Sequence, residues 1–126
     1  MSLFQLGQFK LHSGGATPWR INCELLTPED WDTIAFLGSK IIGPFSGISG
    51  VQSGGEALAK AMSKYITSGP VLICDDVLTT GKSMEDRRDQ LRSFNAIGLV
   101  AFARNPCPDW VKAVWETRTN SLSHTE

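Results

Sequence analysis

The chain has 126 residues, of which 41% are hydrophobic, and this suits one domain with a single core. Twelve Lys and Arg against thirteen Asp and Glu leave a formal net charge of −1. That balance excludes a nucleic-acid partner bound by bulk charge, although it leaves room for a local basic pocket. Three scattered cysteines and two histidines argue against a disulfide framework and against a zinc or histidine-based metal centre.

The chain is expected to form one domain over residues 1–117, followed by a disordered tail over residues 118–126. No apolar run approaches the roughly 18 residues needed to cross a bilayer. The amino-terminal residues also lack the long apolar stretch of a signal peptide. We therefore expect a cytoplasmic protein with no membrane partner.

The first predicted helix runs from Thr27 to Gly38. Thr27 is a capping residue, Pro28 fits the first turn, and Asp30 stands three residues after the cap. Gly38 is expected to close the helix. The next segment, Lys40–Phe45, leans toward β structure, so we predict a strand there and a glycine-rich loop after it.

A second helix is predicted over residues 53–65. Ser53 and Glu56 have the spacing of a capping box. Leu58 and Met62 fall on one helical face, which predicts that this face packs on the core. This part of the chain is therefore expected to form a strand, a loop and a helix in succession.

The second half of the chain alternates apolar and charged segments. Val71–Cys74 is apolar on both faces, which is typical of a central parallel strand. A charged helix is predicted over residues 84–94, and a second apolar strand over residues 96–104. Residues 108–117 fit a strand by alternation or a helix by spacing, and both remain open. The alternation predicts an α/β fold, a small parallel sheet flanked by helices with right-handed crossovers.

The segment VLICDDVLTTGKS (Val71–Ser83) carries the predicted chemistry. A buried strand brings Asp75 and Asp76 to the carboxyl edge of the sheet, where open α/β folds bind ligands. The turn that follows comprises Thr79, Thr80, Gly81, Lys82 and Ser83. Backbone N–H groups at such a helix start suit a terminal phosphate, and carboxylates accept hydrogen bonds from vicinal hydroxyls. The pattern favours a sugar-phosphate site over an acid pair that merely caps a turn.

Gly81–Ser83 also has the sequence that ends a Walker A loop. That motif needs a glycine five residues before Gly81, where this chain has Asp76. An acid there repels a triphosphate, and the backbone freedom of glycine is lost. A nucleotide hydrolase that uses this turn is therefore only a remote alternative.

The segment Val71–Ser83 resembles the motif with which type I phosphoribosyltransferases bind 5-phosphoribosyl 1-pyrophosphate (PRPP). Three further segments, in matching order, are similar to the orotate phosphoribosyltransferase branch. Phe9–Asn22 resembles its amino-terminal segment, and Gly50–Met62 resembles its pyrophosphate loop and the following helix. Gly98–Arg104 resembles the strand that ends in an arginine contacting orotate. The resemblance implies a minimal type I phosphoribosyltransferase fold.

The resemblance also implies roles for single residues. Asp75 and Asp76 would be the catalytic acids that hold the ribose hydroxyls, and the turn over residues 79–83 would hold the 5-phosphate. The pyrophosphate loop would comprise Gly50, Val51, Gln52, Ser53 and Gly54. His12 and Arg104 would contact the base. Mg²⁺ would arrive with PRPP without direct protein ligands, and the protein would be a homodimer.

The chain departs from the family pattern in three places. Ala103 replaces an acid often found before the arginine, and Glu24 stands where a basic residue is common. The family also has a long insertion before the PRPP strand, with a mobile lid that carries basic catalytic residues. Here only Thr67–Pro70 fill that space.

These features imply a PRPP-dependent transferase that acts on a nitrogenous base, with an orotate-like pyrimidine as the first choice, and that releases pyrophosphate. The alternative is a non-catalytic PRPP or nucleotide sensor, or a partner protein, that has lost the lid. Because the lid is missing, PRPP binding is expected to survive better than turnover.

Overall fold

The structure is a computed structural model that describes residues 4–10 and 16–117. His12 and the tail predicted over residues 118–126 lie outside this part of the chain. The strands are β1 (Phe4–Lys10), β2 (Ala16–Ile21), β3 (Gly47–Gly50), β4 (Val71–Leu78), β5 (Ile97–Ala103) and β6 (Val111–Glu116). The helices are α1 (Pro28–Ser39), α2 (Gln52–Met62) and α3 (Lys82–Leu91), with short 3₁₀ turns at Cys23–Leu25 and Ser63–Tyr65.

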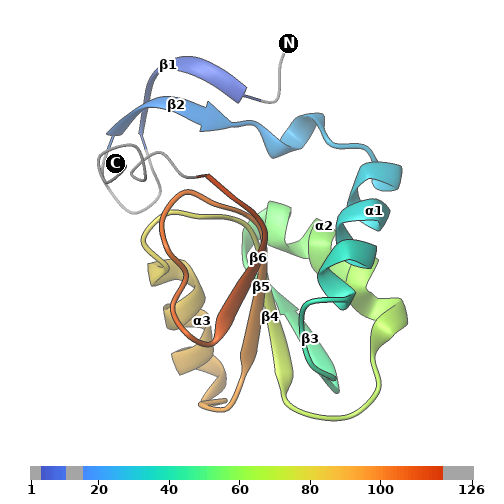
Figure 1. The fold of residues 1–126 in the computed structure, drawn as a ribbon. Coiled ribbons are helices and arrows are strands. Elements are labelled where there is room, and N and C mark those ends of the chain that lie inside the picture. Colours follow the sequence, from blue (N-terminus) through green and yellow to red (C-terminus); the bar gives the residue numbers. More distant parts are fainter. Residues whose placement is uncertain (1–3, 11–15, 118–126) are drawn as a thin grey trace, which may run out of the picture.

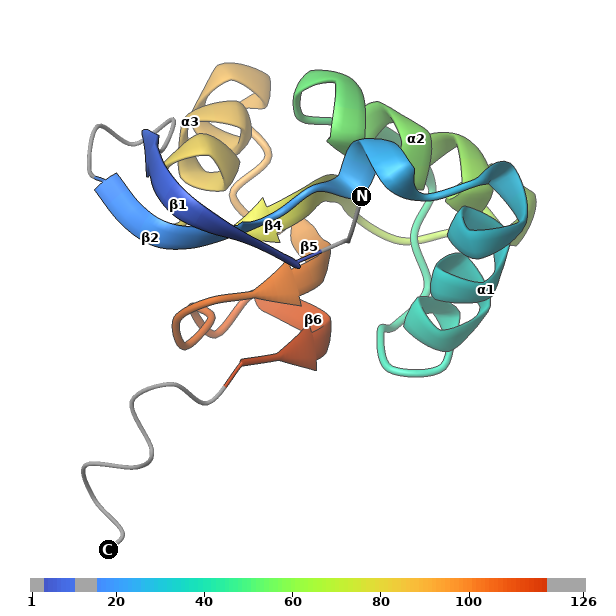
Figure 2. The ribbon, with the colours of Figure 1, turned by 90° about the horizontal axis from the view of Figure 1, so that it is seen from above.

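Four parallel strands form the central sheet, in the order β3-β4-β5-β6. Helix α3 covers one face of this sheet, while α1 and α2 cover the other (Figures 1 and 2). The middle strands β4 and β5 are apolar on both faces, and Ile73 and Leu99 within them are fully buried. The predicted α/β fold with a small parallel sheet is confirmed, and residues 108–117 contribute a strand rather than a helix.

Two hydrophobic cores hold the layers together. Leu58 and Met62 of α2 pack with Leu72 and Leu99 on one face of the sheet. Met84 of α3 packs on the other face, with Ile73 and Val100 among its neighbours. The apolar face predicted for the second helix is thus confirmed, because Leu58 and Met62 have no exposed surface.

An antiparallel hairpin of β1 and β2 lies above the carboxyl edge of the sheet (Figures 1 and 2). Its register pairs Phe4 with Ile21 and Lys10 with Ala16. The sequence patterns did not predict these two strands. Their position matters for function, because ligands of open α/β sheets bind at this edge.

Helix α1 begins as its sequence predicts but ends differently. Thr27 accepts a hydrogen bond from the Asp30 N–H, and the Asp30 carboxylate accepts one from the Thr27 N–H, so the capping box is complete. Gly38 does not close the helix, which continues to Ser39. Instead Gly38 is buried against Leu99, whose Cδ2 would lie 2.5 Å from a Cβ at this position.

The strand predicted at Lys40–Phe45 is wrong. Those residues form the C-cap of α1, at Lys40, and the loop that follows it, and the strand lies at Gly47–Gly50, in the segment predicted as a loop. The Ser46 N–H donates to the Pro70 carbonyl at 2.9 Å, and the parallel pairing with β4 follows from there. Pairing with a buried central strand therefore overrides the weak β propensity of a glycine-rich segment.

Three other boundaries differ from the prediction. Helix α2 begins at Gln52, and its N-cap residue is Val51. Val51 makes no side-chain hydrogen bond to the helix, so the predicted capping box of Ser53 and Glu56 is absent. Strand β4 continues past Cys74 to Leu78, and α3 ends at Leu91 rather than near residue 94.

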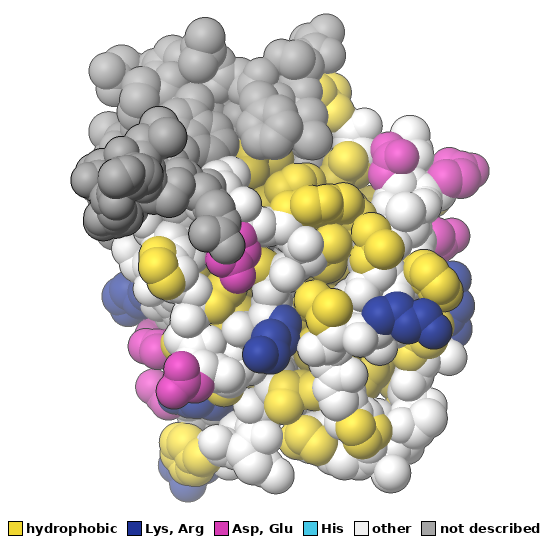
Figure 3. Space-filling view, in the orientation of Figure 1, with side chains coloured by type: hydrophobic (Ala, Val, Ile, Leu, Met, Phe, Trp, Pro, Cys, Tyr) yellow, Lys and Arg dark blue, Asp and Glu magenta, His cyan; other side chains and the backbone are white. Residues whose placement is uncertain are grey.

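The outer surface of α1 and the neighbouring sheet edge is partly apolar, as Figure 3 shows for the face seen in Figure 1. Exposed large side chains include Phe36 and Ile41 near α1 and Trp115 on β6. Trp115 stacks on Phe102, with ring centroids 5.2 Å apart. Within the described ranges, no helix is long and apolar enough to cross a membrane.

Candidate functional site

A cavity of about 630 Å³ lies at the carboxyl edge of the sheet. Strand β4, the first turn of α2, the turn before α3 and the residue after β5 all contribute to its wall. Eight of the predicted site residues line it: Gln52, Ser53, Gly54, Asp75, Asp76, Thr79, Ser83 and Arg104. The fold of residues 50–104 therefore brings predicted site residues that are far apart in the sequence to one cavity.

The two acids lie within β4 rather than after it. Asp75 is only 8% exposed, so it is largely shielded from solvent. Its Oδ1 accepts a hydrogen bond of 2.8 Å from the Asp76 N–H, and the Asp76 Oδ1 accepts one of 2.8 Å from the Val77 N–H. These backbone bonds orient both carboxyl groups at the cavity wall.

Burial and the neighbouring acid change the protonation of Asp75. Burial, together with the side-chain hydrogen bond and the charge of Asp76, raises the pKa of Asp75 to about 8. The charge of Arg87 acts in the opposite direction and lowers it. At neutral pH Asp75 therefore keeps its proton beside Asp76, and the pair offers both a donor and acceptors to a ligand.

The first turn of α2, which contains most of the predicted pyrophosphate loop, approaches the acids closely. A Cβ at Gly54 would overlap the carboxylate of Asp76, and one at Gly55 would lie 2.5 Å from the Cys74 carbonyl oxygen. Gln52 has a φ of 56°, in the left-handed region that side chains rarely adopt. Such strain is typical of binding loops held by their surroundings. Of the predicted pyrophosphate loop, Gly50 and Val51 support this arrangement from outside the cavity.

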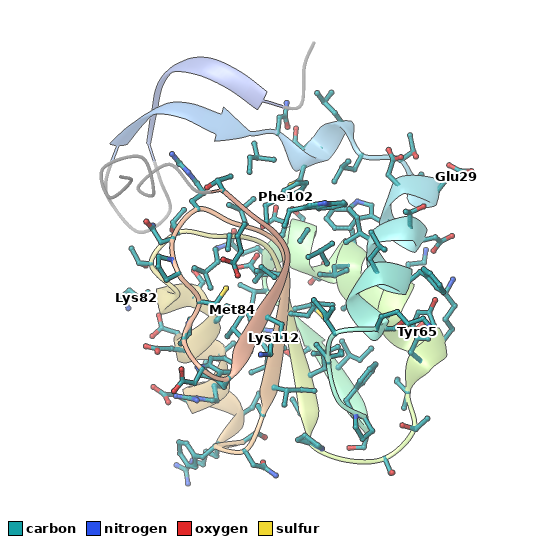
Figure 4. The ribbon with its side chains drawn as sticks, viewed as in Figure 1. Glu29, Tyr65, Lys82, Met84, Phe102 and Lys112 are labelled. Carbon is teal, nitrogen blue, oxygen red and sulfur yellow. The ribbon has the colours of Figure 1, made fainter. Side chains whose placement is uncertain are left out.

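The turn before α3 forms a second, smaller hollow of about 20 Å³ next to the acids, lined by Thr79, Thr80, Gly81, Lys82 and Ser83. Gly81 caps the helix with a φ of 85°, which glycine adopts without strain. The Thr80 hydroxyl accepts from the Lys82 N–H at 3.2 Å. The Lys82 ammonium points outward (Figure 4) and pairs with Asp86 at 2.9 Å, so the backbone and hydroxyl groups dominate this turn.

Arg104 follows β5 and is half-buried at the cavity wall. Its N–H donates to the Leu78 carbonyl at 2.9 Å, which ties the ends of β4 and β5 together. Burial lowers the pKa of the Arg104 guanidinium, which nevertheless stays charged at neutral pH. A cation is therefore present at the wall, on the strand next to the acids.

Several wall residues were missed by the sequence patterns. Cys23, Glu24 and Trp31 belong to the segment that leads from the hairpin into α1, and all three line the cavity. Trp31 has the helical spacing of a core residue, and it is indeed buried. Burial, with the charges of the two acids, raises the pKa of Cys23 to about 12, so its thiol stays protonated. No local motif signals these contacts, because the chain direction after β2 brings them to the site.

The fold of this chain is similar to that of several solved structures. No protein-family model and no curated protein matches the chain. Orotate phosphoribosyltransferase of Aeropyrum pernix matches with a TM-score of 0.73 at 18% identity, over 96% of this chain and 92% of that one. The enzyme of Francisella tularensis matches with a TM-score of 0.60 at 22% identity, over 90% and 80% of the two chains.

A third neighbour is the orotate phosphoribosyltransferase of Mycobacterium tuberculosis H37Rv, in complex with inorganic phosphate. It matches with a TM-score of 0.62 at 15% identity, over 88% of this chain and 86% of that one. Likeness at such identities defines the fold. The chain therefore has the type I phosphoribosyltransferase fold seen in these orotate phosphoribosyltransferases, and the predicted resemblance is confirmed at that level.

The contact between Gly54 and Asp76 predicts the effect of adding a methyl group. Gly54→Ala should lower the free energy of unfolding by about 1–3 kcal/mol, because the loop or the carboxylate must move. Gly43→Ala is the matched control, since a Cβ there meets nothing within 4 Å, and its effect should stay within about 0.5 kcal/mol. Urea unfolding measures both variants, and equal values for the two would contradict the contact.

The protonation of Asp75 predicts a loss of stability as the pH rises. Its pKa is raised in the folded protein from 3.8 to about 8, so between these values the folded state holds a proton that the unfolded chain lacks. The stabilisation is complete below the lower value and is lost as the pH rises through the higher one. The slope is at most about 1.4 kcal/mol per pH unit. Urea unfolding from about pH 5 to about pH 8 should give a flatter profile for Asp75→Asn, and parallel profiles would contradict the shift.

Proposed function

We propose that this protein binds PRPP and transfers its phosphoribosyl group to a nitrogenous base, with release of pyrophosphate. One observation carries the proposal. The acid pair, the glycine-containing first turn of α2 and the hydroxyl-rich turn at the start of α3 lie together at one cavity, and each suits a different part of a sugar pyrophosphate. The phosphoribosyltransferase fold supports the same reading.

Each part of the ligand has a suitable partner. The ribose hydroxyls would bond to Asp75 and Asp76, since carboxyl groups accept from vicinal hydroxyls. The 5-phosphate would lie at the start of α3, where backbone N–H groups and the helix dipole favour an anion. The pyrophosphate would face the backbone of residues 50–54.

The arrangement also suits the chemistry of transfer. Displacement at the anomeric carbon breaks the bond to pyrophosphate and forms one to a base nitrogen, through a state in which the sugar ring carries positive charge. The carboxyl pair lies where it would face that charge, and the fixed loop would orient the leaving group. Positioning of both partners is thus the main contribution expected from these residues.

Mg²⁺ fits this site as an ion carried by PRPP. Mg²⁺ prefers oxygen ligands and commonly combines one or two carboxylates with substrate phosphates. In the part of the chain that the structure describes, no group of three or more acid, His or Cys side chains could hold a metal alone. Asp75 and Asp76 are the residues that would face the ion. When bound, Mg²⁺ neutralises charge on the pyrophosphate.

The proposed base follows from the charges at the cavity wall. Arg104 is the cation at the cavity wall, and a guanidinium suits the ring carboxylate of an orotate-like pyrimidine. Glu24 lines the same cavity and would disfavour an anion near it. Orotate is therefore the first candidate to test, within a panel of bases. The homodimer implied by the resemblance stays a prediction.

A second function, a PRPP or nucleotide sensor without catalysis, is favoured by one feature. Only residues 66–70 connect the 3₁₀ turn after α2 to β4, and this connection is bound to the loop before β3 by the Thr67 N–H, which donates to the Phe45 carbonyl at 2.8 Å. A segment this short and fixed does not close over the site. PRPP binding without turnover on any base in the panel would favour the sensor.

The acid pair provides the main test of the proposal. Asp75→Asn together with Asp76→Asn should weaken PRPP binding at least about a hundredfold, because both carboxyl groups that would hold the ribose hydroxyls are replaced. Amide side chains keep the shape of the buried pair, so the fold should persist. Asp89→Asn on the exposed side of α3 is the control. Titration calorimetry with PRPP and Mg²⁺ measures all three proteins, and unchanged affinity in the double variant would remove the basis of the proposal.

Arg104 tests the choice of base. Arg104→Ala should weaken the binding of orotate far more than that of uracil, which has no carboxylate, by about tenfold or more. Calorimetry in the presence of PRPP compares the two bases. Equal changes for both would show that Arg104 does not pair with a ring carboxylate, and would leave orotate without support.

A further inference from the structure

Arg87 makes an unusual long-range contact from α3. Its NH1 donates to the Ser49 hydroxyl at 2.7 Å and to the Gly50 carbonyl oxygen at 2.8 Å. Its Nε donates to the Gln90 side chain at 3.2 Å, which fixes the guanidinium on its own helix. The side chain is half-buried at these contacts. Sequence patterns offered only a charged helix face here, so the contact comes from the structure alone.

The two acceptors lie at the end of an edge strand. Strand β3 pairs with β4 on one side, and no other described strand pairs with its outer side. The Val51 N–H donates to the Cys74 carbonyl at 2.8 Å, toward β4. Since backbone groups alternate in direction along a strand, the preceding Gly50 carbonyl faces the open edge. Arg87 satisfies that carbonyl at the point where the chain enters the loop.

The loop that begins there needs support. Gln52 holds a φ of 56°, and Gly54 touches the Asp76 carboxylate, so the loop is both strained and closely packed. Arg87 stands on α3, and the same helix begins at the hydroxyl-rich turn of residues 79–83. A single rigid helix thus contacts both the turn and the loop.

We propose that Arg87 is a positioning residue that holds the pyrophosphate loop at a fixed place relative to the phosphate turn, so that one ligand spans both. This inference rests on the proposed function for the identity of the ligand. The hydrogen bonds that carry it do not depend on that identity. Arg87 touches the loop and not the ligand, so it acts through Gly50 and Ser49.

The test compares three ligands on two variants of the full chain. Arg87→Met should weaken PRPP and pyrophosphate binding about tenfold and leave ribose 5-phosphate within about twofold. The turn is untouched, and loss of the Arg87 charge only raises the pKa of Asp75 further, so Asp75 keeps its proton at neutral pH in both proteins. Arg92→Met is the matched control, an exposed arginine just beyond the same helix, and should change none of the three. Titration calorimetry with Mg²⁺ gives the affinities. Equal weakening of all three ligands by Arg87→Met, or of none, would overturn the inference.

Hydrogen exchange provides a readout that needs no ligand. The Val51 N–H donates to the Cys74 carbonyl just after β3, and the Gly55 N–H donates to the Val51 carbonyl in the first turn of α2. Both should exchange about tenfold faster in Arg87→Met than in Arg92→Met. Unchanged exchange would overturn the inference even if binding were altered. If the wild-type protein bound none of the three ligands, the proposed function would be wrong, and the exchange rates alone would decide the role of Arg87.

If Arg87→Met does not fold, Arg87→Lys replaces it in both measurements. Lysine keeps the charge but lacks the planar fork that reaches two acceptors. It should therefore produce the same order of effects at smaller size, with pyrophosphate affected and ribose 5-phosphate spared. Equal weakening of all three ligands, weakening of none, or unchanged hydrogen exchange would again contradict the inference.

Discussion

Asp75 is a carboxyl group buried within the central strand β4, beside a second acid, and the rest of the site is arranged around it. A buried carboxylate is costly, and a like charge next to it raises that cost. Three features offset the cost here. Asp75 keeps its proton to about pH 8, the Asp76 N–H donates to it, and the charge of Arg87 acts on it from α3. A polar group so expensive to bury contributes little to a core, which favours a role in binding.

The order of the sheet places this acid pair at the meeting point of the other parts. Strand β4 lies between β3 and β5, so the loop after β3 and the residue after β5 both come to its carboxyl end. The segment after β3 can approach closely because Gly54 has no side chain that would meet Asp76. The end of β5 brings Arg104 to the same cavity. The turn before α3 continues from β4 itself. Four segments thus reach one cavity through strand order alone.

Sequence patterns predicted the parts of this arrangement that depend on local chemistry. The capping box at Thr27, the apolar strand at residues 71–74 and the acid pair with its hydroxyl turn are all local signals, and the structure contains each of these features. Strand β3 was missed because pairing with β4, rather than β propensity, makes Gly47–Gly50 a strand. Trp31 and Arg87 could not be assigned to the site, since only the path of the chain shows which buried or charged side chains reach it.

The balance of charge at the cavity explains why backbone groups matter so much in the proposed site. Glu24, Asp75 and Asp76 line the wall, against the cation of Arg104, while the Lys82 ammonium is paired outside with Asp86. A ligand with several phosphate charges would meet net repulsion from these side chains. The proton on Asp75 removes part of this repulsion, and an accompanying Mg²⁺ would remove more of it. Among the described residues, the N–H groups at the start of α3 and in the predicted pyrophosphate loop of residues 50–54 would supply further attraction, and such groups act only when the backbone is held in place. The rigidity of that loop is therefore as important to binding as the identity of any side chain in it.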